Sequence, residues 1–210
     1  MATFNNWNII SMPSSPAPRS IEWSLSDVVA ANTNPFTGGQ QFYDWGAGWI
    51  EATVNLPPLT QSQANQWIAF LMQAAGMSNI FQFGDPLSPA LQAQSGGTPV
   101  VHGANQSGRQ LVTNGWYAPS SHPVPPIYPG DWIQIGYRWY RNLTQQTPDR
   151  FNSGAATLDI WPPLRESPAD GATIITANTQ GIFRLASNQR KYSVDQTLVY
   201  GLQFTIREAL

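Results

Sequence analysis

One stretch decides the fold: residues 128–141, with the sequence YPGDWIQIGYRWYR. Pro129 supplies a fixed φ and Gly130 a permissive one, so the chain turns there and continues directly into an extended run. From Trp132 onward two sets of residues alternate, and both sets contain bulky side chains. A two-residue period with both faces filled is typical of a strand in the middle of a sandwich or barrel wall.

A second run of this kind covers residues 156–161, with the sequence ATLDIW, and Pro162-Pro163 follows it directly. Neither proline donates a backbone hydrogen bond, so strand pairing ends there. We expect these two runs to form the middle of an all-β unit that builds a surface rather than a reaction centre.

Shorter strands are predicted wherever brief alternating runs lie between turn residues. Residues 40–57 predict two strands joined by a corner at Gly46-Ala47-Gly48, and Asn114-Gly115 predicts a hairpin within residues 111–117. The predicted strands lie near residues 21, 42, 50, 132, 158, 183 and 203. The expected fold class is therefore mainly β, a barrel or sandwich of short antiparallel strands.

One helix is predicted among these strands, over residues 60–75. Thr60 followed by Gln63 forms a capping-box pattern, and apolar residues then recur at helical spacing. Gly76 stands where a helix commonly ends in the left-handed conformation. We expect the apolar stripe of this helix to pack against a sheet.

The domain organisation is predicted from changes in pattern. Residues 1–20 form an N-terminal arm whose prolines prevent regular pairing, and such an arm either folds back on its own domain or reaches a neighbour. Residues 21–210 form a β-rich domain. Within it, residues 86–128 hold an excursion or small subdomain, because this segment is low in pattern and rich in turn-forming residues.

The composition favours protein contact over catalysis. Only 10% of the residues are charged, whereas 12% are aromatic and nine are Trp; an average globular protein has roughly 25% charged residues. A surface poor in charge and rich in aromatics and neutral amides suits contact with other proteins. An assembly component is therefore favoured over an enzyme, although carbohydrate-binding modules share this composition.

Several classes of function are not supported by the residues. With a net charge of −2 and one lysine, Lys191, the chain has no basic cluster for a nucleic acid. The absence of Cys excludes disulfides, thiolate catalysis and Cys-based metal sites. Neither a secretory signal nor an apolar run of membrane-spanning length is visible. We expect a chain made in a cytoplasm, without membrane insertion.

Catalytic patterns are weak. A glycosidase needs two carboxylates facing each other, and Asp131 and Asp159 on the two central runs are a candidate pair. Asp131 follows Gly130 at a strand start, however, where its side chain is better explained as an acceptor of turn N–H bonds. The two histidines, His102 and His122, lie in loops without a partner for a triad or a metal. We predict no enzyme activity and no cofactor.

Tryptophans inside patterned elements are interpreted as packing residues: Trp67, Trp132, Trp139 and Trp161. Trp7, Trp45 and Trp116 lie at the arm or at turns instead, and with Phe4 they are candidate interface residues. Exposed tryptophans would suit a sugar as well as a protein, and the sequence does not separate these two ligands.

Arg165 is the remaining candidate interface residue. Pro162-Pro163 holds the following residues in a rigid path, which lowers the entropy lost when Arg165 is fixed. We expect its guanidinium to meet a carboxylate or carbonyl, from Glu166, Asp170 or a neighbouring subunit. The alternative is a solvated arginine at the rim of the sheet.

The chain resembles minor tail proteins of long-tailed bacteriophages, and the resemblance spans nearly its whole length. The matching segments in the first half are Pro35-Phe36-Thr37-Gly38 with Gln41, residues 49–58, the helix with Ala64, Trp67, Phe70 and Leu71, Gly76, and residues 81–85. Those in the second half are residues 129–136, 154–158, 160–165 and 183–185. The Gly-Asp-Trp and Pro-Pro-Leu-Arg stretches are the most specific.

The resemblance implies a distal tail protein of the tail tip. Proteins of this family form a ring, commonly sixfold, between the tail tube and the hub or fibre-bearing proteins. It further implies a structural role in the virion tail, assembled in the host cytoplasm, with itself and the tube, hub, tape-measure or fibre proteins as partners. No active site is implied. The competing hypothesis is a carbohydrate-binding β-module that recognises host-surface glycans.

Overall fold

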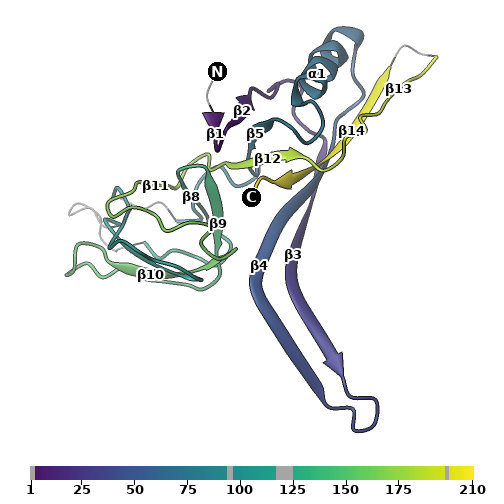
Figure 1. Cartoon of the computed structure of the whole chain (residues 1–210). Helices are drawn as coiled ribbons and strands as arrows, with labels where there is room; N and C mark the ends of the chain where they lie inside the picture. Colours follow the sequence, from purple (N-terminus) through teal and green to yellow (C-terminus); the bar gives the residue numbers. More distant parts are fainter. Residues whose placement is uncertain (1–2, 94–96, 117–124, 197–198) are drawn as a thin grey trace. The chain divides into compact units, whose positions relative to one another are not determined.

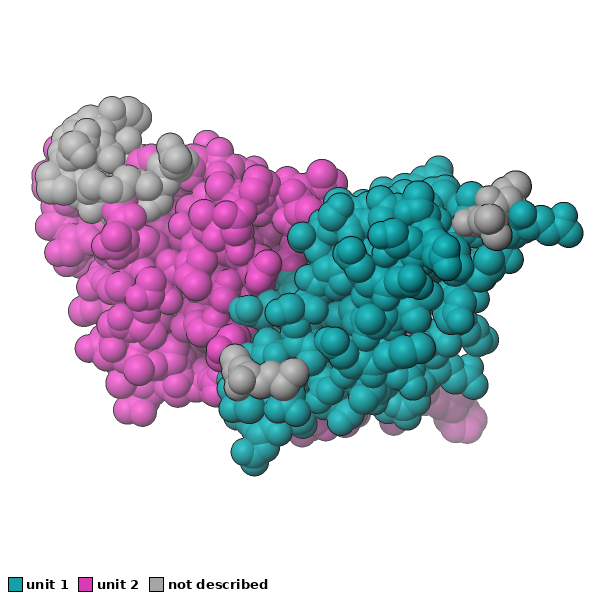
Figure 2. All heavy atoms as spheres, turned by 90° about the horizontal axis from the view of Figure 1, so that it is seen from above, with its two compact units in different colours: residues 1–26, 49–83, 182–210 teal, residues 27–48, 84–181 magenta. Residues whose placement is uncertain are grey.

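A computed structural model describes residues 3–93, 97–116, 125–196 and 199–210. The chain is mainly β with a single packed helix, as the sequence predicts. It divides into two compact units. Figure 2 colours unit 1, residues 1–26, 49–83 and 182–210, and unit 2, residues 27–48 and 84–181.

The first sheet has the strand order β1-β2-β5-β12-β14-β4-β3, and β13 pairs with β14 (Figure 1). Its strands are β1 Thr3–Phe4, β2 Trp7–Ile10, β3 Ser20–Thr33, β4 Gln40–Asn55, β5 Ile80–Phe83, β12 Gly181–Leu185, β13 Tyr192–Val194 and β14 Tyr200–Glu208. Along β14 the buried residues Leu202, Phe204 and Ile206 alternate with more exposed ones. One face of this sheet therefore forms the core of unit 1.

The helix α1, Gln61–Ala74, covers that buried face. Thr60 and Gln63 form the predicted capping box, and the left-handed conformation begins at Ala75, one residue before the predicted Gly76. Trp67 and Phe70 pack against Phe204, with ring centroids 5.9 and 6.4 Å apart. The helical stripe thus provides the second layer that a one-sided sheet needs.

The N-terminal arm folds back onto unit 1 and contains regular structure, contrary to the irregular arm that the prolines suggested. β1 and β2 form a tight hairpin whose two turn residues, Asn5 and Asn6, both have positive φ. Asparagine tolerates this conformation, which the favoured two-residue hairpin turns require. β2 then pairs in parallel with β5.

Unit 2 contains a six-stranded sheet with the order β11-β8-β9-β10-β7-β6. Its strands are β6 Val100–Val101, β7 Gln110–Asn114, β8 Trp132–Ile135, β9 Arg138–Asn142, β10 Ala156–Trp161 and β11 Ile174–Ile175. The two deciding runs therefore occupy the middle of a sheet, as expected. Within the segment 86–128, predicted as an excursion or small subdomain, Val100–Val101 and Gln110–Asn114 form β6 and β7 of this sheet.

The first deciding run is a hairpin rather than one strand. β8 and β9 are joined by Gly136-Tyr137, and Gly136 has a φ of 58°. A glycine in the first position of a two-residue turn fits the tight connections that match strand twist. The turn brings Trp132 and Trp139 together in a stack with ring centroids 3.6 Å apart.

Both faces of the hairpin formed by β8 and β9 are covered. One face packs into a core built from Val101, Leu111, Trp116, Ile127, Ile133, Ile135, Tyr140, Ala156, Leu158, Ile160 and Ile174. On the other face, Trp139 donates its indole N–H to Thr179 Oγ1 at 2.9 Å, and the backbone N–H of Gln180 donates to Gln134 Oε1 at 2.8 Å. The expected strands with two filled faces are thus confirmed.

Trp116 belongs to this core, so the prediction that it is an exposed interface residue is wrong. Its side chain is 1% exposed. The indole N–H donates to Thr113 Oγ1 at 2.7 Å, and the Thr113 hydroxyl donates to the carbonyl of Ala156 at 2.7 Å. Among the described strands β7 pairs with β6 and β10. The hairpin predicted at Asn114-Gly115 reaches residue 117, which lies outside the described residues.

Replacing Thr113 with Val tests this buried relay. The isosteric change removes the acceptor of the Trp116 indole and the donor to Ala156, and we expect a loss of about 1–3 kcal/mol in the free energy of unfolding. The matched control is Val112→Thr on the same strand, because Val112 is 38% exposed. Urea denaturation measures the free energy of unfolding of both variants. Equal losses in the two variants would contradict a stabilising role for the hydrogen bonds of Thr113.

Candidate assembly interface

The longest elements of the structure are the paired strands β3 and β4 (Figure 1). They form one continuous hairpin, whereas the sequence predicted a corner at Gly46-Ala47-Gly48. Gly46 adopts a φ of 62° inside β4. Its backbone N–H donates to Asp44 Oδ1 at 2.7 Å. A bulge of this kind lets a strand continue past an irregular residue.

The turn at the end of this hairpin is closed by short-range hydrogen bonds, as turn residues favour. The backbone N–H of Asn34 donates to the carbonyl of Gly39 at 2.8 Å, and that of Gly38 donates to the carbonyl of Asn34 at 2.9 Å. Asn34 Oδ1 also accepts the N–H of Phe36 at 2.9 Å. β3 continues to Thr33, and the turn that follows it connects the strand to β4.

Every residue from Val29 to Ala47 is exposed, and we call this segment the distal hairpin. It contains large apolar side chains, namely Val29, Phe36, Phe42, Tyr43 and Trp45. Phe36 is 94% exposed and Trp45 is 56% exposed. Phe42 and Tyr43 are successive strand residues, so apolar groups lie on both faces of the ribbon. A two-stranded ribbon with neither face covered is at best marginally stable in water.

The distal hairpin also has a free edge. β3 is the terminal strand of the sheet order and spans 14 residues. Its distal part, residues 28–33, has the sequence VVAANT, with neither a charge nor a proline. Charges and prolines are the usual devices that prevent edge strands from pairing with other chains. This edge is therefore open to strand addition.

Two side chains of unit 2 hold the base of the hairpin. Trp161, at the end of β10, donates its indole N–H to Asp27 Oδ1 on β3 at 2.8 Å. Arg165 donates a guanidinium N–H to the carbonyl of Gly48 on β4. The Arg165 backbone N–H donates to the Tyr140 hydroxyl at 3.3 Å. We call Trp161 and Arg165 the hairpin clamp, because they bind one strand each.

The expected bonded state of Arg165 is confirmed, with a carbonyl as its partner. The two nearby carboxylates serve other groups: Glu166 pairs with Arg138 at 3.4 Å, and Asp170 accepts the backbone N–H of Gly103 at 2.7 Å. Whether Arg165 also contacts another subunit stays a prediction.

The other predicted interface residues lie in different settings. Trp45 lies exposed on the distal hairpin, and its ring meets that of Tyr43 edge to face at 4.7 Å. Phe4 and Trp7 are half-buried in unit 1, and the guanidinium of Arg184 lies 4.2 Å from the Trp7 ring centroid. Burial lowers the pKa of Arg184. Of these three residues, Trp45 thus belongs to unit 2, as Arg165 does, whereas Phe4 and Trp7 belong to unit 1.

Sequence reasoning missed Val29, Phe36, Phe42 and Tyr43 as interface residues. The signal was present, because residues 40–45 place apolar side chains on both faces of a strand. That pattern predicts a strand of the barrel or sandwich, whereas the structure leaves these residues exposed.

Asp131 and Asp159 do not form a catalytic pair. Asp131 accepts the backbone N–H of Gln92 at 2.9 Å with one oxygen and that of Tyr128 at 2.8 Å with the other. Trp132 and Trp161 both lie opposite Arg141, so strand alternation directs Asp131 and Asp159 to opposite faces. The interpretation of Asp131 as a turn acceptor is confirmed.

Comparison with known proteins adds no relative: no family model matches the sequence, and no curated protein matches it. The described residues bring no three His, Asp or Glu side chains together in a way that could hold a metal ion. Among the same residues, no helix is both long enough and apolar enough to cross a membrane.

The clamp is tested by a double-mutant cycle between Asp27→Ala and Trp161→Phe. The Phe ring keeps most of the packing but lacks the indole N–H, so we expect a coupling energy of about 1 kcal/mol in urea denaturation. The control cycle pairs Asp27→Ala with Trp139→Phe, whose indole binds Thr179 instead. Additivity in the first cycle, as in the control, would show that the clamp bond contributes nothing.

Proposed function

We propose that this protein is a structural component of a bacteriophage tail tip and forms a homo-oligomeric ring between the tail tube and the hub or fibre proteins. The observation that carries the proposal is the distal hairpin, which has a free edge and apolar side chains on both faces. The resemblance to minor tail proteins, which includes Pro35-Phe36-Thr37-Gly38 within this hairpin, supports it independently.

The hairpin suits a ring because a closed ring uses heterologous contacts, in which one subunit presents a different patch from the one it receives. An extended strand with a free edge can add to a sheet of the next subunit through backbone hydrogen bonds. Phe42 and Trp45 then become buried in the contact, as aromatic anchors of interfaces commonly are. The clamp fixes the base of the hairpin and lowers the entropy lost on assembly.

The second candidate function is glycan binding, favoured by the exposed pair Tyr43 and Trp45. Sugars stack best on open, flat aromatic faces, whereas these rings meet edge to face with planes 70° apart. We therefore rank glycan binding below assembly. A glycan array distinguishes the two, since a pure assembly protein binds no glycan on it.

Removing the aromatic anchors tests the ring. We expect the double variant Phe42→Thr, Trp45→Thr to stay folded but to lose oligomerisation, because both side chains lie outside the two cores. Light scattering after size exclusion gives the mass, and circular dichroism gives the fold. The control Leu87→Thr removes another exposed apolar side chain outside the hairpin and should assemble like the parent.

The proposal fails if the parent chain stays monomeric at high concentration and in the presence of neighbouring tail proteins. It also fails if the double variant assembles as the parent does.

A further inference from the structure

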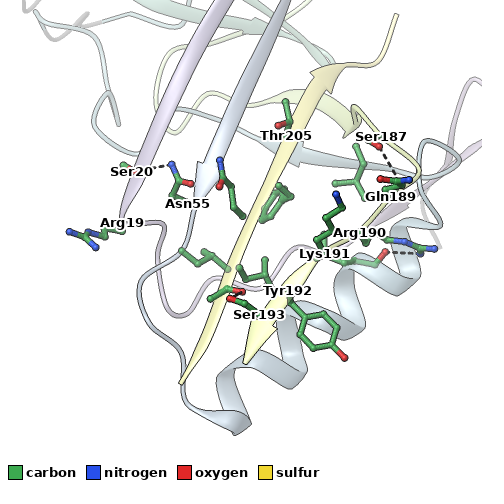
Figure 3. Close-up of a pocket in the computed structure, with 17 residues that line it drawn as sticks. Arg19, Ser20, Asn55, Ser187, Gln189, Arg190, Lys191, Tyr192, Ser193 and Thr205 are labelled. Atoms are coloured by element: carbon green, nitrogen blue, oxygen red, sulfur yellow. Dashed lines mark hydrogen bonds between the residues drawn. The ribbon is translucent and has the colours of Figure 1, made fainter. Parts of the chain in front are cut away.

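Unit 1 contains an open groove of about 1060 Å³ on the side of β14 shown in Figure 3. One side of the groove is formed by Arg19 and Ser20 at the start of β3, with Asn55 at the end of β4. The other side is formed by Ser187 and residues 189–193. The groove is separate from the distal hairpin, since all its lining residues belong to unit 1.

The groove exists because the chain leaves the sheet between β12 and β13. β12 ends at Leu185 and β13 begins at Tyr192, and the intervening loop is attached to the end of α1. Asn188 Oδ1 accepts the backbone N–H of Met77 at 3.1 Å, and Arg190 donates to the carbonyl of Leu71 at 3.2 Å. These bonds give the wall of the groove a fixed position.

The lining is cationic. Arg19, Arg190 and Lys191 are three of the ten cations of the chain, and none of its twelve carboxylates is among the lining residues. Within the described residues none of these three cations has an ion-pair partner. The chain as a whole has a net charge of −2, so this concentration of positive charge is local.

The lining also contains apolar and neutral polar groups. Leu185 and Phe204 contribute apolar surface, whereas Asn55, Ser193 and Gln203 contribute groups that donate and accept hydrogen bonds. Such a mixture suits a polypeptide segment with acidic and apolar side chains, because its backbone also needs hydrogen-bond partners. A polyanion such as a phosphate polymer would need a continuous row of cations instead.

We infer that this groove binds an acidic, apolar-bearing segment of a partner protein in an extended conformation. The cations on the two sides meet its carboxylates, and the apolar lining accepts the alternate side chains. This inference does not depend on the proposed ring, because the groove belongs to unit 1, whereas the distal hairpin belongs to unit 2.

The probe is a short fluorescein-labelled peptide in which aspartate and leucine alternate, and its binding to the full chain is measured by fluorescence anisotropy. We expect binding that weakens with salt, since exposed charges are screened. A second peptide with asparagine in place of aspartate should bind at least about tenfold more weakly, because several charge pairs are lost together. Unlabelled polyphosphate serves as a competitor.

The variants Arg19→Gln and Lys191→Gln should each weaken binding of the acidic peptide by about two- to fivefold. Arg190 is not substituted in these variants, because its side chain attaches the loop to α1. The matched control is Arg150→Gln, which removes an exposed cation from unit 2 and should leave binding unchanged.

Four results would overturn the inference: no binding of the acidic peptide, equal binding of both peptides, unchanged binding by the Arg19 and Lys191 variants, or tight binding of polyphosphate alone. Peptide binding that falls as the protein concentration rises would assign the groove to a second copy of the chain, which also contradicts a separate partner.

Discussion

The burial of apolar surface is the constraint on which this structure depends, and the distal hairpin does not meet it. In unit 1 the sheet is covered by α1, and in unit 2 both faces of the central strands are packed. The ribbon from Val29 to Ala47 has neither a second layer nor a core of its own. Its apolar groups gain favourable free energy only when another surface covers them.

The hairpin clamp attaches the distal hairpin to the central sheet of unit 2. Trp161 and Arg165 lie just before and after Pro162-Pro163, where the chain leaves the central sheet. Their partners, Asp27 and Gly48, lie on the two strands of the hairpin. The rigid end of β10 therefore fixes where the hairpin begins, and leaves the remainder of the ribbon available to a partner.

Low charge fits the same account. Exposed surfaces with few charges repel one another weakly, which favours association. The few cations are not spread evenly, because three of them line one groove in unit 1. The chain thus offers two kinds of contact surface, an apolar ribbon and a cationic groove, which suit two chemically different partners.

Local patterns predicted much of the fold. The capping box at Thr60 and the strand near residue 203 depend on neighbouring residues, and both are present. The hairpin at Gly136-Tyr137 was missed because a two-residue turn preserves the alternation that a continuous strand would show. Local sequence therefore indicated strand but not the reversal of the chain.

Features set by distant residues could not be predicted from the sequence. Trp116 follows a turn-like Asn114-Gly115, but its burial depends on Leu158 and Ile160 in a strand far along the chain. The rigid lead-in to Arg165 predicted a bonded guanidinium, whereas its acceptor, the carbonyl of Gly48, is brought there by the fold. The exposure of the distal hairpin likewise depends on whether a distant part of the chain covers it, which its own residues do not indicate.

The most direct test of this account is hydrogen exchange of residues 29–47, followed by mass spectrometry across a dilution series of the full chain. If another copy covers the distal hairpin, its backbone amides exchange rapidly at low concentration and become protected as the protein associates, while the two cores stay protected throughout. Protection of these amides that is independent of concentration, or rapid exchange in the assembled state, would contradict the account.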